Sequence, residues 1–274
     1  MTKIKKTQLA IIAGAVVLFV LLYIANKKPS ESTESNGEQT QEISENIESF
    51  VKSAESSLAS GQKSKTDFYL KQYRENKNYQ WLDSLVAFWD KNKRPDIASF
   101  WYENKANSVN DAISWFKAGD RYYYSVRFVK DNEELKPLYN SAMRCYEKGL
   151  KLDPLNTEAK IMLASCFIEG SADPMKGVAM LREIEKTDSN NVTLQLNFAF
   201  FSVKSQQWDK AIHRFKKVLE IDTNYIEAYL HLADVYEQTG KKNLTIEMLE
   251  KYKLKTTDVL AKDEIDKYIQ QLKN

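Results

Sequence analysis

Few side chains in this sequence could take part in catalysis or bind a metal ion. The chain has two cysteines, Cys145 and Cys166, in no CxxC or CxxxC spacing, and two histidines, His213 and His231. Zinc sites bring several such ligands together at short spacings, so a zinc site is not indicated. We interpret both cysteines as small buried residues, with a disulfide or a reactive thiol as the alternatives.

His231 is the better of the two catalytic candidates because Asp234 follows it by three residues. An enzyme also needs a nucleophile, or a second acid or base, in a convergent pocket. The acidic groups at 132–134 and 262–264 are more typical of solvated faces or helix ends. We therefore predict a protein that is not an enzyme, has no catalytic residues and uses no cofactor or metal, and interpret His231 as part of a polar or partner-binding face.

The composition favours helices joined by short loops. The chain has 274 residues, of which 43% are hydrophobic, but only 8 glycines and 5 prolines. An all-β protein would need many more turns. The formal net charge is +2, and five lysines lie in residues 1–28, so the remainder is slightly acidic. No basic patch indicates binding to nucleic acid.

One apolar run, Leu9 to Ala25, is long enough to cross a bilayer, which takes at least about 17 residues. We predict a membrane anchor over residues 1–28. A removed signal peptide is the alternative, but Tyr23 would occupy a cleavage position that requires a small residue. Three lysines precede the run and two follow it, which weakly favours a cytoplasmic N-terminus with the bulk of the chain outside.

Two segments lie between this run and the main part of the chain. Residues 29–42 are rich in Ser, Thr, Glu and Gln, so we predict a flexible linker. Residues 43–78 are predicted as an N-terminal helical segment, in which Gly61 ends a first amphipathic helix. We interpret that helix as core, with pairing to a partner helix as the alternative. Its apolar positions recur at helical spacing: Ile43, Ile47, Phe50, Val51, Ala54 and Leu58.

The main part of the chain is internally repetitive. Residues 142–153, AMRCYEKGLKLD, resemble residues 211–222, AIHRFKKVLEID, and Asp188 repeats the final Asp midway between Asp153 and Asp222. This spacing corresponds to a repeat of about 34 residues, the length of a helix-turn-helix unit. In each copy a small residue precedes a large one by four positions: Ala142 and Tyr146, Gly177 and Leu181, Ala211 and Phe215, Thr245 and Leu249.

The pattern resembles the tetratricopeptide repeat family, whose first helix reads W-x2-L-G-x2-Y and whose second reads A-x3-F. Trp115, Ala118, Gly119 and Tyr122 match one first helix, and Leu232, Ala233 and Tyr236 match another. The resemblance implies an all-α, right-handed solenoid with about five repeats over residues 79–257. Residues 258–274 would cover its end as a capping helix with the stripe Ile265, Tyr268, Ile269 and Leu272.

Three departures from the family pattern stand out. Gly119 and Ala142 are farther apart than the unit allows, which predicts longer helices or an insertion between them. Lys160 and Gln195 occupy positions where the first helix normally has a large apolar residue. The earliest copy, with Leu82, Leu85, Val86 and Trp89 followed by Ala98 and Tyr102, is degenerate.

The resemblance also implies a concave groove that binds a protein or peptide, lined by side chains that the repeat does not need for packing. Asn197 matches one residue of the clamp that some relatives use for chaperone tails, but Phe200, Glu227 and Leu230 do not fit it, so chaperone docking is not predicted. The expected groove residues are Phe116, Lys117, Asp120, Tyr123, Tyr124, Met162, Ser165, Glu169, Leu196, Asn197, Phe200, His231 and Asp234.

The sequence thus predicts a membrane-tethered, non-enzymatic adaptor or scaffold with a protein or peptide partner. A single-pass protein on the periplasmic side of a bacterial inner membrane, serving envelope assembly or secretion, is the favoured interpretation. The alternatives are an organelle receptor whose repeats face the cytosol and a homo-oligomeric structural scaffold.

Overall fold

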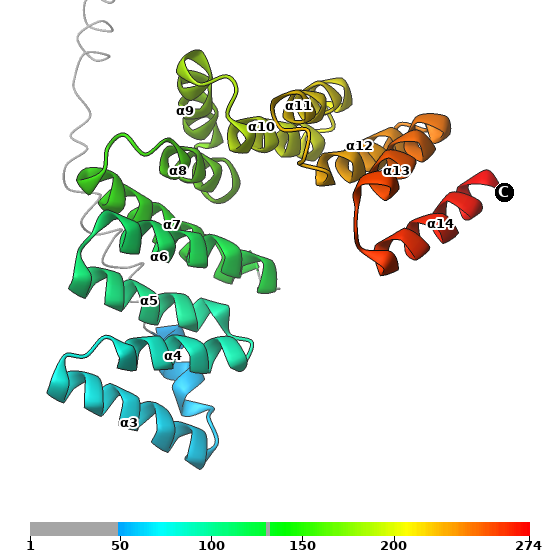
Figure 1. Ribbon diagram of the computed structural model, residues 1–274. Coiled ribbons are helices and arrows are strands. Elements are labelled where there is room, and N and C mark those ends of the chain that lie inside the picture. The colour runs from blue at the N-terminus through cyan, green and yellow to red at the C-terminus, as the bar shows by residue number, and fades with distance from the viewer. Residues whose placement is uncertain (1–48, 130–131) are drawn as a thin grey trace, which may run out of the picture. The chain divides into compact units, whose positions relative to one another are not determined.

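The computed structural model describes residues 49–129 and 132–274 (Figure 1). The predicted span Leu9–Ala25, the linker 29–42 and the first apolar positions, Ile43 and Ile47, lie outside this part. Within the described residues, regular structure is helical, without strands, as predicted. None of the helices described is both long enough and apolar enough to cross a membrane.

Consecutive helices form hairpins, and each hairpin packs mainly on its neighbours in the chain (Figure 1). The order after residues 49–56, which are helical, is α3 (Ser60–Asn76), α4 (Gln80–Lys91), α5 (Pro95–Val109), α6 (Ala112–Ser125), η1 (Val126–Phe128), α7 (Asn132–Leu152), α8 (Thr157–Gly170), α9 (Pro174–Thr187), α10 (Val192–Lys204), α11 (Trp208–Ile221), α12 (Glu227–Gln238), α13 (Lys242–Lys255) and α14 (Val259–Lys273).

The repeated Asp marks the turn that joins one hairpin to the next. The Asn156 side chain accepts a hydrogen bond from the backbone N–H of Ala159 and donates one to Asp153, and thereby caps α8. Asn191 does the same for α10 with Leu194 and Asp188. Such caps satisfy N–H groups that the first helical turn leaves free. The spacing of three residues from Asp to Asn therefore encodes a helix start.

The small residues of the repeat lie where two helices approach closely. A Cβ atom on Gly177 of α9 would lie 2.3 Å from the carbonyl oxygen of Ala164 in α8, so a larger residue would force the backbones apart. Ala142 and Ala211 are completely buried at the equivalent positions. The large partners Tyr146 and Phe215 are buried as well and fill the interior.

The extra residues between Gly119 and Ala142 lie in two places. The 3-10 helix η1 follows α6, and α7 extends over 21 residues with Pro137 inside it. Both lengthening and insertion therefore contribute, in the region where the sequence departs from the family pattern.

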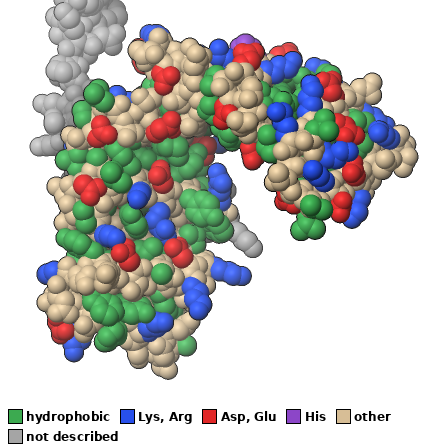
Figure 2. Space-filling model, in the orientation of Figure 1, with side chains coloured by type: hydrophobic (Ala, Val, Ile, Leu, Met, Phe, Trp, Pro, Cys, Tyr) green, Lys and Arg blue, Asp and Glu red, His purple; other side chains and the backbone are tan. Residues whose placement is uncertain are grey.

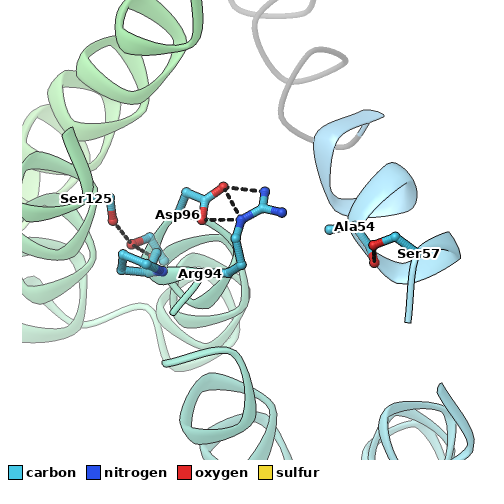
Figure 3. A network of polar contacts seen from close by, with 7 residues as sticks. Ala54, Ser57, Arg94, Asp96 and Ser125 are labelled. Carbon is cyan, nitrogen blue, oxygen red and sulfur yellow. Dashed lines mark hydrogen bonds and ion pairs between the residues drawn. The ribbon is translucent and has the colours of Figure 1, made fainter. Parts of the chain in front are cut away.

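Residues 49–56 pack against the main helical array. Val51 and Ala54 are buried in the same hydrophobic cluster as Val86 and Trp89, which favours the core interpretation over pairing with a partner helix. The prediction that Gly61 ends this helix was wrong, because Gly61 lies in the first turn of α3. The polar contacts nearby include a Ser57 hydroxyl bonded to the Ala54 carbonyl (Figure 3).

Polar contacts also fix the start of α5. The Arg94 guanidinium donates to both carboxylate oxygens of Asp96, and the hydroxyls of Ser99 and Ser125 meet at 3.0 Å (Figure 3). Ser99 and Ser125 are completely buried, so their mutual bond and their bonds to backbone carbonyls satisfy both groups. This contact joins α5 to the last residue of α6.

The final helix, α14, packs on α13 with the predicted stripe. Ile265 and Ile269 are buried and Tyr268 and Leu272 are partly buried, all in a cluster that includes Met248 of α13. The stripe therefore covers apolar surface of the last hairpin, as a capping helix must.

Candidate functional site

Four of the predicted groove residues, Tyr123, Glu169, Asn197 and Phe200, line a single pocket. Tyr123 lies on α6, whereas Asn197 and Phe200 lie on α10, and the pocket between them measures about 290 Å³. We call it the tyrosine pocket. Its other lining residues are Val126 and Arg127 of η1, Tyr139 of α7, Glu169 of α8 and Phe201 of α10.

Glu169 organises one wall of the tyrosine pocket. Its two carboxylate oxygens accept hydrogen bonds from the hydroxyls of Tyr123, at 3.0 Å, and Tyr139, at 2.7 Å. The two phenol rings meet edge to face, 6.1 Å apart. Burial and the nearby Glu169 charge raise the pKa of both phenols well above the usual value, so both remain neutral donors. The wall is thereby fixed before any partner arrives.

The predicted role of Ser165 as a groove residue was wrong. Ser165 is completely buried, and its hydroxyl donates to the Asn197 side-chain oxygen at 2.6 Å. The Asn197 amide in turn donates to the backbone carbonyl of Thr193 at 2.8 Å. Ser165 therefore orients Asn197, which is half-buried and lines the pocket itself.

Phe200 is the exposed aromatic residue of the tyrosine pocket, with 43% of its surface accessible. Its ring meets Phe215 and His231 edge to face, at 5.5 Å and 4.9 Å between centroids. His231 also stacks on Phe215 at 5.1 Å. The Phe200 ring therefore packs against Phe215 and His231 on one side and is exposed to solvent on another.

The interpretation of His231 as a free polar group of the groove needs correction. Its imidazole is half-buried between aromatic rings, and burial lowers its pKa despite the opposing charges of Asp234 and Glu227. A neutral, stacked imidazole is a packing group. Asp234 is exposed on the same helix, and its charge favours the protonated imidazole without outweighing the effect of burial.

Three other predicted groove residues pack against neighbouring helices and are not accessible groove side chains. Phe116 is partly buried, and its ring lies where a side chain on Gly149 would otherwise stand. Met162 packs on the same cluster, and Leu196 packs on the cluster around Phe215. The expectation that these side chains have no packing duty was wrong, because neighbouring helices cover them. Lys117 is exposed.

Asp120 and Tyr124 line a different hollow, of about 750 Å³, together with Lys93, Arg121 and Phe128. Tyr124 and Phe128 are each about half exposed and lie 5.0 Å apart. Asp120 accepts a hydrogen bond from the Tyr146 hydroxyl at 2.7 Å, and burial raises its pKa. The predicted groove residues that line a hollow are thus divided between two hollows that share no lining residue.

Four residues of the tyrosine pocket were not predicted: Val126, Arg127, Tyr139 and Phe201. The first three lie in the segment where the repeat pattern is interrupted, so the register could not assign a direction to them. Phe201 follows Phe200 in the sequence. It lines the pocket and also packs against the hydrophobic cluster of Ile161, Leu181 and Leu194.

Metal and thiol chemistry find no support in the described part of the chain. No group of His, Cys, Asp or Glu there is arranged to hold a metal ion. Cys145 and Cys166 are both buried and free, which rules out the disulfide alternative for this pair. Burial also raises the pKa of both thiols, so neither is a reactive thiolate.

Comparison with known proteins gives a local family match and a shared fold. A family model for the TPR repeat, the tetratricopeptide repeat, matches residues 203–240, which cover the end of α10, all of α11 and α12. No curated protein sequence matches the chain significantly.

Among solved structures, a tetratricopeptide repeat protein from Parabacteroides merdae ATCC 43184 aligns with a TM-score of 0.52 and 15% identity, over 85% of this chain and 88% of its own. A thermophilic TPR protein of Thermus thermophilus gives 0.47 and 16%, over 71% and 98%. YrrB, described as a TPR protein with an unusual peptide-binding site, gives 0.41 and 18%, over 73% and 97%. Residues 203–240 therefore match the tetratricopeptide repeat locally, and the array of helices around them has the fold of tetratricopeptide repeat proteins.

Proposed function

We propose that this chain is a membrane-tethered adaptor that binds a protein or peptide partner through the tyrosine pocket. The observation that carries the proposal is that Tyr123, Asn197 and Phe200, from two helices distant in the sequence, line one preformed pocket. Proteins of this fold are generally non-catalytic adaptors, which supports a binding role.

The pocket has the size and chemistry of an anchor site. Its volume of about 290 Å³ is at the lower limit of ligand pockets, which suits one or two side chains of a larger partner. Phe200 and Phe201 offer apolar surface, while Arg127 and Asn197 add polar groups. A partner side chain that is aromatic or aliphatic would pack on Phe200, because such anchors in pockets dominate protein interfaces.

The tether is the apolar run Leu9–Ala25, which precedes the described residues. Its length and the lysines before it favour an anchor, with the repeats on the outer side of the membrane. A partner in envelope assembly or secretion is consistent with that placement. If the chain is inserted in the opposite orientation to the one that the lysines favour, the same pocket would face the cytosol.

Photo-crosslinking in cells tests both parts of the proposal. A photoreactive phenylalanine analogue replaces Phe200, and as a matched control it replaces Phe68, a phenylalanine on α3 that is 50% exposed against 43% for Phe200. After irradiation, membranes are washed at high pH. We expect a discrete adduct with another protein from position 200 but not from position 68, in the membrane pellet.

Other outcomes would contradict the proposal in distinct ways. Adducts from position 68 alone would move the binding surface away from the tyrosine pocket. An adduct at twice the mass of the chain would favour the homo-oligomeric scaffold. Release of the protein into the wash would argue against a membrane anchor. The position from which the adduct forms would still test the tyrosine pocket as the binding site.

A further inference from the structure

A larger cleft lies among α8, α9, α10 and α11 and is not part of the tyrosine pocket. It encloses about 760 Å³, and we call it the basic cleft. Its floor is apolar and includes Ile168, Leu181, Phe198 and Phe201. Phe201 is the one residue that it shares with the tyrosine pocket.

The cleft exists because consecutive helices pack unevenly at this point. α9 packs closely on α8 but meets α10 over few residues, unlike α11, which packs more extensively on α12. The interior is divided here, and Leu181 belongs to a small cluster with Ile161 and Leu194. Phe198 and Phe201 are only partly buried against that cluster. Apolar surface that normally lies between repeats is therefore left accessible.

The rim of the cleft is predominantly basic. Arg182, Lys204 and Lys210 are exposed, and none of them has an acidic partner among the described residues. The acidic lining residues are Glu185, which pairs with Arg214, and Asp209. In Figure 2, a histidine and both basic and acidic side chains are visible along the edge over α10 and α11. The rim thus has a surplus of positive charge.

Arg214 joins the rim to the floor in a fixed position. Its guanidinium donates to Glu185 and to the side-chain oxygen of Gln195, and it lies 4.4 Å from the centre of the Phe198 ring. Gln195 is buried and donates to the Ser189 carbonyl at 2.7 Å. This explains the polar residue at a position where the repeat normally has an apolar one: Gln195 holds Arg214 in place.

We propose that the basic cleft binds an acidic amphipathic helix of a partner protein. Apolar side chains of that helix would lie on Phe198 and Phe201, and its acidic residues would face the surplus cations. A helix suits the site better than an extended strand, because the surrounding backbone groups are already bonded within helices and could not pair with a strand. The proposal does not depend on the tyrosine pocket.

Fluorescence anisotropy with the full-length chain in a mild detergent tests this inference. The probe is a labelled peptide of Leu and Glu, about 18 residues or five turns long, with Leu at positions i, i+3, i+4 and i+7. A second peptide carries Lys in place of each Glu. We expect the acidic peptide to bind, the basic one to bind at least about tenfold more weakly, and the affinity to fall as salt is added.

Two matched double variants locate the peptide. Arg182→Glu with Lys210→Glu is expected to weaken binding at least about tenfold. Lys186→Glu with Lys216→Glu changes the same charge on the same two helices, α9 and α11, outside the cleft, and should have little effect.

Equal losses in both double variants would mean that only net charge matters and would overturn the proposal. So would equal binding of the two peptides, or no binding at all. If Phe200→Ala weakened peptide binding and the cleft double variant, Arg182→Glu with Lys210→Glu, did not, the peptide would bind in the tyrosine pocket. That last result would leave the proposed function intact and refute the basic cleft.

Discussion

Replacing Phe215 by alanine is expected to lower the free energy of unfolding by about 3–5 kcal/mol. Phe215 is 1% exposed, stacks on His231 and meets Phe200 edge to face. Truncation would remove these contacts and leave a cavity at the junction of α10, α11 and α12, which the surrounding helices could fill only in part. Denaturant unfolding followed by circular dichroism measures the change.

Phe68→Ala provides the control for this experiment. Phe68 is 50% exposed and packs edge to face on Trp81, so its loss should cost less than about 1 kcal/mol. A cost below about 1 kcal/mol for Phe215→Ala would show that Phe215 is not part of the structural interior, and the assignment of the repeat register would fail with it.

The second large effect is expected at Glu103. Its carboxylate accepts hydrogen bonds from Arg144, the shortest at 2.8 Å, and one from the Tyr122 hydroxyl at 2.8 Å. The side chains of Arg144 and Glu103 are only 18% and 15% exposed. Glu103→Ala leaves a largely buried guanidinium without its counter-charge, which costs about 3–5 kcal/mol. The same unfolding experiment measures this loss.

An exposed ion pair serves as the comparison. Glu247 and Lys251 lie 2.7 Å apart on α13, with about half of each side chain exposed. Glu247→Ala should therefore cost less than about 1 kcal/mol. If Glu103→Ala proved equally mild, the Glu103–Arg144–Tyr122 contact would not hold α5, α6 and α7 together as the structure indicates.

The sequence predicted the fold best at positions where the structure permits only one type of residue. The small residues Gly177 and Ala211 defined the repeat, and in the structure Gly177 has no room for a Cβ atom and Ala211 is completely buried. The recurring Asp gave the length of the repeat, although the hydrogen bonds of Asp153 and Asp188 with the Asn three residues later became visible only in the structure. The helical fold was predicted from the repeat period, the scarcity of glycine and proline, and the resemblance to the tetratricopeptide repeat family.

The candidate site was harder to predict than the fold. The helical register indicates to which side of a helix a side chain points, but not which residues of other helices lie next to it. Tyr123, Glu169, Asn197 and Phe200, which the repeat register directs to one side, line one pocket. Ser165 and Met162 have similar directions, but adjacent helices bury or partly cover them. The irregular stretch from η1 into α7 contributes Arg127 and Tyr139, which no repeat pattern could place.

The tyrosine pocket also changes which variants are informative. Tyr123→Ala would remove a hydrogen bond to Glu169 and a ring that packs on Tyr139, so lost binding could follow from a disturbed wall. Phe200 is the better choice because it is exposed and has no hydrogen-bonding group on its side chain. Its truncation should change the surface of the pocket with little effect on the wall.

The affinity of the crosslinked partner for Phe200→Ala, compared with Phe68→Ala, is the most direct test of the proposed binding site. Isothermal titration calorimetry with purified partner is the measurement, with melting temperatures taken for both variants. We predict a loss of at least about 30-fold for Phe200→Ala, as expected for an interface anchor worth about 2 kcal/mol, and less than about twofold for Phe68→Ala. Equal affinities for the two variants, with both proteins folded, would contradict binding at the tyrosine pocket.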